Sequence, residues 1–84
     1  MNVRILELSN GHISLEFGEK DVSLVAMAAT KLFGEVSHKP YIMAAEVYFG
    51  GAKFIYQDEW NDPCLISNTD LGDACLLRVY EEMK

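Results

Sequence analysis

Apolar and polar residues alternate on both sides of Asn10-Gly11, a pattern typical of a β-hairpin. Asn-Gly is the preferred pair for a two-residue type I′ turn, because both turn positions need a positive φ. With this turn Leu8 faces Ile13, and the register collects most apolar residues on one face: Leu6, Leu8, Ile13, Leu15 and Phe17. Ile5 is the exception, since the same register places it on the polar face.

Residues 21–33, DVSLVAMAATKLF, predict a helix. Asp21 suits the N-cap position, and Gly34 suits the position that follows the helix end. The residues expected to pack on the sheet recur at helical spacing: Val22, Val25, Ala29, Leu32 and Phe33. A second apolar side, made of Leu24, Met27 and Ala28, predicts a contact with another helix.

A second hairpin is predicted around Gly50-Gly51. A two-residue turn there pairs apolar residues on one face: Phe49 with Ala52, Val47 with Phe54, and Ala45 with Tyr56. The preceding stretch, residues 34–40, predicts a loop or a short helical turn, and Pro40 with the run IMAAE also suits the start of a helix. Residues 58–63, DEWNDP, break the alternation, and residues 64–66 form a candidate fifth strand.

A final helix is predicted from Thr69 or Asp70 to Met83. Residues 67–69 are all of capping types, and Asp70 and Asp73 suit the positive end of the helix dipole. Its expected buried stripe is Ala74, Cys75, Leu77, Val79, Tyr80 and Met83. The order ββαββ(β)α predicts one α+β domain over residues 1–84: a two-layer sandwich, with two helices on one face of an antiparallel sheet of four or five strands.

The net charge of −6 is concentrated in the last third of the chain. Residues 58–84 contain seven acidic residues against Arg78 and Lys84, a balance of −5, whereas residues 1–57 carry only −1. Such charge repels phosphates and therefore disfavours direct nucleic-acid binding. It favours a basic protein as partner.

The sequence lacks the residue spacings that are typical of metal sites and of catalytic motifs. His12 and His38 lie far apart without HxxxH or CxxC spacing, and the acidic loop 58–62 lacks the glycine and terminal glutamate of a calcium site. Ser37-His38 is not part of a GxSxG elbow. We therefore expect no metal, no cofactor and no catalytic activity. Cys64 and Cys75 are expected to be small buried hydrophobes rather than a disulfide.

The sequence also predicts a soluble cytoplasmic protein. Its apolar runs fall short of the roughly 20 residues that a membrane-spanning helix needs. The first ten residues, MNVRILELSN, alternate and lack the basic-then-apolar layout of a signal peptide.

The single tryptophan, Trp60, lies between carboxylates in the stretch QDEWNDPC. Tryptophan is frequent at binding hot spots, because it buries a large rigid surface, and surrounding acids would steer a basic partner. The alternative interpretation is that Trp60 covers the end of the core while the acids face solvent. On the first interpretation, the partner-binding residues are Asp58, Glu59, Trp60, Asp62, Asp70 and Asp73.

In size, acidity and compact α+β layout, the chain resembles small bacterial or phage inhibitors, such as toxin-immunity and anti-defence proteins. This likeness is one of type and not of motif. The leading hypothesis is a non-catalytic protein-binding module whose acidic face occludes a basic site on a partner such as a nuclease. Two alternatives stay open at this stage. One is a structural or regulatory homodimer, joined by an open strand edge or by the second apolar side of helix 21–33. The other is a small enzyme or ligand binder that uses the carboxylates of residues 58–62.

Overall fold

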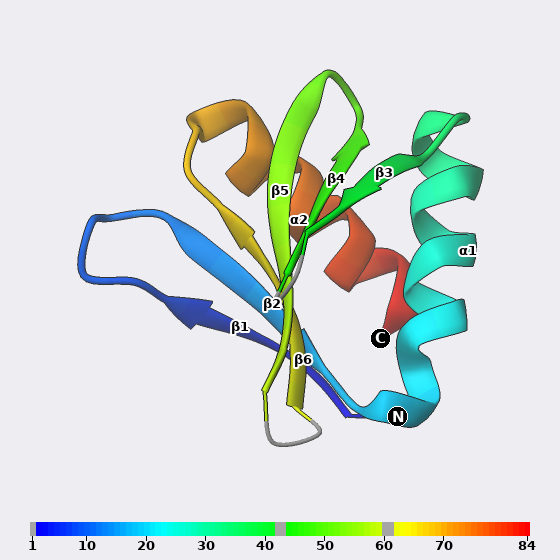
Figure 1. The fold of residues 1–84 in the computed structure, drawn as a ribbon, viewed down its shortest axis with the longest axis horizontal. Coiled ribbons are helices and arrows are strands. Elements are labelled where there is room, and N and C mark those ends of the chain that lie inside the picture. Colours follow the sequence, from blue (N-terminus) through cyan, green and yellow to red (C-terminus); the bar gives the residue numbers. More distant parts are fainter. Residues whose placement is uncertain (1, 42–43, 60–61) are drawn as a thin grey trace.

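The structure is a computed structural model that describes residues 2–41, 44–59 and 62–84. Its strands are Val3–Glu7 (β1), Ile13–Phe17 (β2), Ser37–Pro40 (β3), Ala45–Phe49 (β4), Ala52–Glu59 (β5) and Asp62–Ser67 (β6). Its helices are Val22–Phe33 (α1), which follows a 3-10 turn at Glu19–Asp21, and Asp70–Met83 (α2). In these ranges six antiparallel strands form one sheet in the order β1-β2-β6-β5-β4-β3 (Figure 1). The predicted α+β class is confirmed, with six strands in place of four or five.

The strand order follows from one long crossing and a series of hairpins. Helix α1 carries the chain from β2 to the far edge of the sheet, where β3 begins. Strands β3 to β6 then return by antiparallel neighbours until β6 lies between β5 and β2. Both helices contribute to one core with the sheet, and they lie on the same side of it (Figure 1).

The first hairpin lies where the sequence predicts it, but its register is shifted by one residue. The structure pairs Ile5 with Leu15 and Leu6 with Ser14, whereas the two-residue turn predicted Leu6 opposite Leu15. Because side chains alternate along a strand, this shift moves Ile5 to the helix side and Leu6 to the outer side, where it is 45% exposed. The predicted apolar face was therefore wrong for β1, and Ile5 is not an exception.

The shift arises because three residues, 9–11, form the loop instead of two. The Leu8 N–H donates to the His12 carbonyl at 2.8 Å, and the Gly11 N–H donates to the Leu8 carbonyl at 3.1 Å. Gly11, with φ 88°, occupies the left-handed position that closes a three-residue hairpin loop. Asn-Gly suits both loop lengths, so the packing of β1 against the core decides between them.

The second hairpin is confirmed in position and register. Gly50 and Gly51 have φ of 61° and 81°, and Phe49 pairs with Ala52 as the two-residue turn predicts. Strand β4, Ala45–Phe49, is the predicted partner of β5, so the alternative of a helical start at Pro40 and IMAAE is wrong. The loop or short helical turn predicted for residues 34–40 was also wrong, because Ser37–Pro40 forms β3. All four residues of β3 are exposed and show no alternation, so hydrogen bonding to β4 is what makes this segment a strand.

The predicted break at residues 58–63 is much shorter in the structure. Strand β5 continues to Glu59 and β6 begins at Asp62, with Asp58 paired to Pro63 and Glu59 to Asp62. The fifth strand that the sequence predicts at residues 64–66 is thus confirmed and longer. Residues 60 and 61 lie outside the described residues, so the two interpretations of Trp60 stay predictions.

Both helices begin and end close to the predicted residues. The Thr69 hydroxyl caps α2 by accepting a hydrogen bond from the Gly72 N–H at 2.9 Å. Gly34 follows α1 with φ 84°, and its N–H donates to the Thr30 carbonyl. Asp21 holds the N-cap position, but its carboxylate accepts from the Asn2 N–H at 3.2 Å instead of capping α1.

The core lies between the sheet and the two helices. Its fully buried apolar side chains include Leu15, Phe54, Leu76 and Val79. The stripe predicted for α2 was therefore wrong at two positions, because Leu76 replaces Leu77, and Ala74 is exposed.

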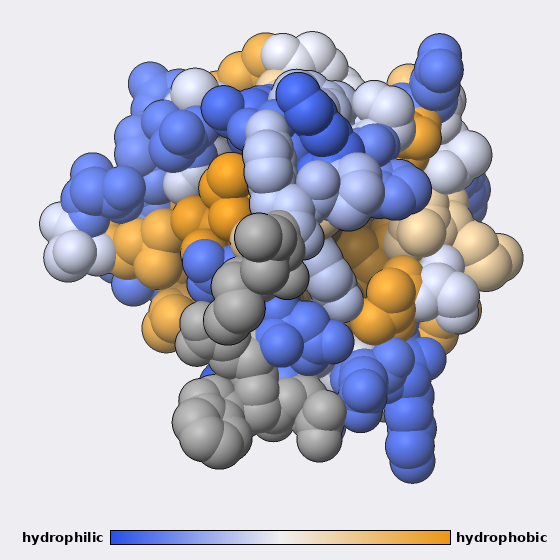
Figure 2. Space-filling view, in the orientation of Figure 1, coloured by the Kyte–Doolittle hydropathy of each residue, from blue (hydrophilic) through white to orange (hydrophobic). Residues whose placement is uncertain are grey.

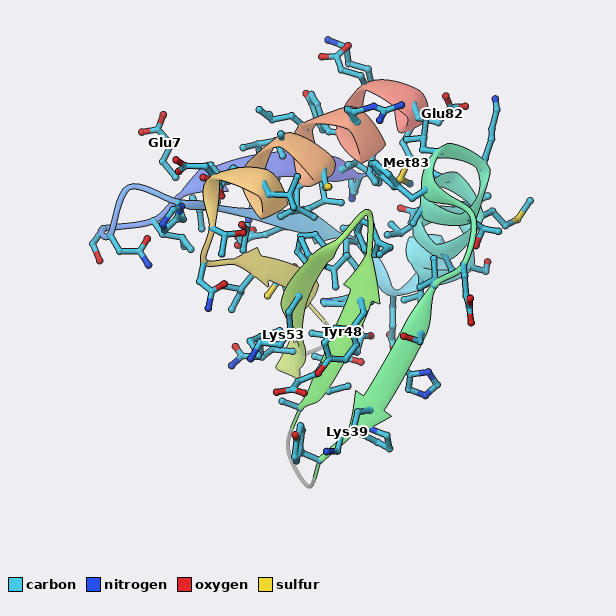
Figure 3. The ribbon with its side chains drawn as sticks, turned by 90° about the horizontal axis from the view of Figure 1, so that it is seen from above. Glu7, Lys39, Tyr48, Lys53, Glu82 and Met83 are labelled. Atoms are coloured by element: carbon cyan, nitrogen blue, oxygen red, sulfur yellow. The ribbon has the colours of Figure 1, made fainter. Side chains whose placement is uncertain are left out.

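On α1 the buried residues are Val25, Ala28 and Ala29, while Val22 is 37% exposed. Figure 3 shows Glu82 and Met83 of α2 beside α1, where the two helices meet. The predicted helix–helix contact is thereby confirmed.

Candidate functional site

Strands β5 and β6 continue to pair with each other beyond their ladders with β4 and β2, and this end forms a two-stranded ribbon (Figure 1). On one side, β4 pairs with β5 only from Ala52 to Tyr56. On the other side, β2 pairs with β6 only from Cys64 to Ile66. Residues 58–59 and 62–63 therefore pair with each other but with no third strand among the described residues. We call this segment the acidic ribbon.

The acidic ribbon presents carboxylates on both of its faces. Asp58 shares the helix-side face with Tyr56, two residues before it, whereas Asp62 lies on the opposite face of the ribbon. Both side chains are exposed. Burial raises the pKa of the Tyr56 hydroxyl, and the negative charge of Asp58 raises it further. Of Glu59 only the backbone is described, and Trp60 lies outside the described residues.

The structure does not bring all the predicted partner-binding residues together. Asp70 and Asp73 lie in the first turn of α2, beyond the other end of β6 from Asp62. At a rise of about 3.3 Å per residue, β6 separates the two groups by about 17 Å. The acidic residues of the last third of the chain therefore lie in three separate places: the acidic ribbon, the start of α2 and the end of α2. At the end of α2, Glu82 pairs with Lys31 at 2.7 Å.

Asp73 joins the first hairpin to the start of α2. Its Oδ2 lies 2.8 Å from Nδ1 of His12, and its Oδ1 accepts a hydrogen bond from the Ile13 N–H at 3.2 Å. Burial raises the pKa of Asp73, but hydrogen bonds from His12, Ser67 and the Ile13 N–H outweigh it, so the pKa lies below its ordinary value. This carboxylate is engaged within the fold, unlike the exposed Asp70.

We expect Asp73→Asn to lower the free energy of unfolding at neutral pH by about 1–2 kcal/mol, because one acceptor oxygen becomes an NH₂ group. A lowered pKa in the folded state stabilises the protein above the unfolded-state pKa, near 3.9, and this contribution is lost as pH falls through the folded value. Urea unfolding should therefore show a difference in unfolding free energy between wild type and variant at pH 7, and this difference should shrink as the pH falls below about 3.9. A difference in unfolding free energy that stays constant across this pH range would contradict the lowered pKa of Asp73 in the folded protein.

His12, Asp70 and Asp73 form a cluster of potential metal ligands that the sequence does not reveal. One ligand atom from each lies within 4.8 Å of the others. A nitrogen with two carboxylate oxygens is a donor set that zinc accepts. Both oxygens of Asp73 already accept hydrogen bonds, however, so a metal ion would have to displace the His12–Asp73 contact. Residues 12 and 73 become neighbours only through the tertiary fold.

A polar cluster occupies the outer face of the sheet at β4 and β5. The Tyr48 hydroxyl donates to Glu46, and the Lys53 ammonium lies 3.6 Å from the same carboxylate. The bond from Tyr48, aided by Lys53, lowers the pKa of Glu46. Figure 3 shows Lys39, Tyr48 and Lys53 on the side of the sheet away from α2. The one carboxylate in this group is therefore paired with a cation and a hydroxyl.

An apolar cleft lies between α1 and the β3–β5 part of the sheet, and sequence reasoning did not predict it. Its volume is about 320 Å³. Val47 and Tyr56 line this space on the side of the sheet, and four residues line it on the side of α1: Val22, Val25, Ala26 and Ala29. We call this space the α1 cleft. Figure 2 shows its mouth as an apolar hollow between β3 and α1. In the sequence, the feature that indicates this cleft is the small size of the side chains on the sheet-facing side of α1.

Comparison with family models, with curated proteins and with solved structures finds no match to this chain. Within residues 2–41, 44–59 and 62–84, neither helix combines the length and the apolar character that crossing a membrane requires.

Proposed function

We propose that this chain is a non-catalytic protein-binding module, which acts in the cytoplasm by placing its acidic ribbon in a basic site of a partner protein such as a nuclease. The acidic end of β5 and β6 carries this proposal. The end of this ribbon makes no ladder pairs with a third strand among the described residues, so it can enter a concave site that a flat sheet cannot reach. Its β6 side still packs on the fold, because Pro63 is buried and Asp62 borders a cleft that Arg4 and Glu16 also line. The function of the chain would then be inhibition, of the kind that immunity and anti-defence proteins of bacteria and phages perform.

The charge arrangement supports fast and salt-sensitive association. Exposed Asp58 and Asp62 point to opposite faces of the ribbon, so a basic site that surrounds it meets a carboxylate on either side. Complementary charges of this kind mainly raise the association rate and are screened by salt. A partner large enough to span about 17 Å would also contact Asp70 at the start of α2.

The shape of the ribbon supports binding over catalysis. Catalytic and ligand sites are usually concave, and their carboxylates are partly withdrawn from water. Asp58 and Asp62 are exposed instead, although Asp62 also borders a cleft that Arg4 and Glu16 line. The exposure of both carboxylates therefore favours binding over the alternative of an enzyme built on the carboxylates of residues 58–62.

The test is a pull-down from host lysate on the immobilised protein, washed at low and then at high salt. We expect a basic protein to be retained at low salt and released at high salt. Asp58→Lys and Asp62→Lys should each weaken its binding at least about tenfold, because an attraction becomes a repulsion. Trp60→Ala, measured in the same assay, tests whether the tryptophan contributes to the contact.

Glu35→Lys is the matched control, since it changes the same charge on an exposed loop residue away from the ribbon. We expect it to leave binding within about twofold of wild type. Asp70→Lys then shows whether the start of α2 belongs to the interface. Retention of the partner by Asp58→Lys and Asp62→Lys, or its loss with Glu35→Lys alone, would contradict the proposal.

Self-association is a second candidate function, favoured by apolar residues exposed on α1. Met27 is 66% exposed and Leu24 is 39% exposed, on the side of α1 that the sequence predicts as apolar. A homodimer formed there would bury apolar surface and respond little to salt. Light scattering over a concentration series at two salt concentrations separates the two candidates, because only the homodimer shows a mass that rises with concentration and persists at high salt.

A further inference from the structure

We infer that the α1 cleft is a binding site for one small, neutral, apolar molecule. The inference concerns a part of the fold separate from the acidic ribbon, and it holds or fails independently of the proposed function. It rests on the shape of the cleft, on the chemistry of its walls and on the strand at its mouth.

The cleft has the dimensions of a small-molecule site. Its volume of about 320 Å³ lies at the lower end of the range for pockets that enclose drug-sized ligands. Helix α1 forms one wall, and the sheet forms the other, mainly with residues of β4 and with one residue each from β2, β3, β5 and β6. Phe17 and Tyr56 lie within its lining, with ring centroids 6.4 Å apart. A ligand would therefore be enclosed by walls that already belong to the folded core.

The cleft persists because the helix wall is made of small side chains. Val25, Ala26 and Ala29 are small side chains that line the cleft on the α1 side, and Val47 of β4 lines it on the sheet side. An apolar space left unfilled is unfavourable in proportion to its volume, and water gains few hydrogen bonds there. An apolar molecule that fills this space would supply the missing packing contacts.

The charges around the cleft select a neutral ligand. Its lining is apolar except for His38 at the mouth and the Tyr56 hydroxyl, so nothing inside it pairs with an ionic group. Asp58 and Glu19 are close enough to Tyr56 for their negative charges to raise its pKa. The same field opposes an anion such as a fatty-acid carboxylate. A cation would lose its hydration inside the cleft without compensation, because no carboxylate is among the described residues that line it.

The strand at the mouth is poorly suited to an added peptide strand. β3 has only four residues and ends at Pro40, which lacks the N–H that a new strand would require. A peptide that extends the sheet at this edge would gain few main-chain hydrogen bonds. A compact molecule that enters between β3 and α1 needs none of them.

The test uses two fluorescent probes that share an anilinonaphthalene skeleton: neutral N-phenyl-1-naphthylamine, and 8-anilino-1-naphthalenesulfonate, which carries a sulfonate. We expect saturable binding of one equivalent of the neutral probe, with at least about tenfold weaker binding of the anionic one. Ala26→Leu, which places a larger side chain in the cleft, should weaken the neutral probe at least about tenfold. Thr30 is also exposed on α1 but lies outside the lining, so Thr30→Leu should leave the affinity for the neutral probe within about twofold.

Val47→Phe fills the cleft from the opposite wall and is the second variant if Ala26→Leu does not fold, as judged by circular dichroism. Three results would overturn the inference. The first is the absence of saturable binding to the wild-type protein, and the second is unchanged binding to both filling variants. The third is a dimer in sedimentation that Ala26→Leu dissociates, because a second copy of the chain would then occupy the cleft.

Discussion

Replacing Leu76 by alanine is expected to lower the free energy of unfolding by about 2–5 kcal/mol, whereas Leu77→Ala should lower it by less than about 1 kcal/mol. The two side chains are identical and adjacent on α2, but Leu76 is 0% exposed and Leu77 is 46% exposed. Truncating Leu76 therefore removes buried methyl groups and leaves a cavity, while truncating Leu77 mainly shortens a side chain already in water.

Urea unfolding of both variants, followed by circular dichroism, measures this difference directly. The helix propensity change from leucine to alanine is the same at both positions and cancels in the comparison. The sequence pattern had placed Leu77, not Leu76, in the buried stripe. A larger loss for Leu77→Ala would therefore restore the sequence-based stripe and show that α2 is rotated about its axis relative to the structure.

Gly50→Ala is expected to destabilise the protein by about 2–4 kcal/mol, since two unfavourable effects combine. Gly50 has φ 61°, a left-handed conformation that an L-residue adopts at a cost of about 1–2 kcal/mol. A Cβ there would also lie 2.7 Å from the Cys75 sulfur and 3.0 Å from the Phe33 ring. Both neighbours belong to the packed region between the second hairpin and the two helices, so they have little room to move.

Gly11→Ala is the matched control for Gly50→Ala, because Gly11 has φ 88° and a methyl group added there would meet no atom within 4 Å. Only the backbone effect remains, and we expect a loss of about 1–2 kcal/mol. Adding Cys75→Ala to Gly50→Ala should recover part of the loss, which a double-mutant cycle quantifies. Equal losses for Gly50→Ala and Gly11→Ala would contradict the close packing of the turn against α1 and α2.

The two hairpins differ in whether the local sequence alone determines the register of the strands. Gly50-Gly51 lies between strands whose apolar residues allow one sensible register, and the structure has that register. Asn10-Gly11 suits a loop of two or of three residues, and both Ile5 and Leu6 are apolar, so the local sequence is ambiguous. Burial of Ile5 opposite Leu15 settles the choice, and that contact needs the helices in place.

The sequence by itself determined the elements whose signals lie within a few residues: both helices with their ends, the second hairpin, the α+β class and the acidic character of the last third. Caps, glycine turns and hydrophobic periodicity act locally, and so they can be read without the fold. Strand β3 depends on a neighbour instead, since its exposed residues 37–40 carry no pattern of their own.

Only the tertiary structure decided which acids are exposed together and where space remains between the layers. It separates the ribbon from the start of α2, pairs Asp73 with His12 across sixty-one residues and leaves the α1 cleft between α1 and the sheet. Each of these depends on the distance between elements remote in sequence. The packing of side chains in the whole core sets that distance, and no local pattern encodes it.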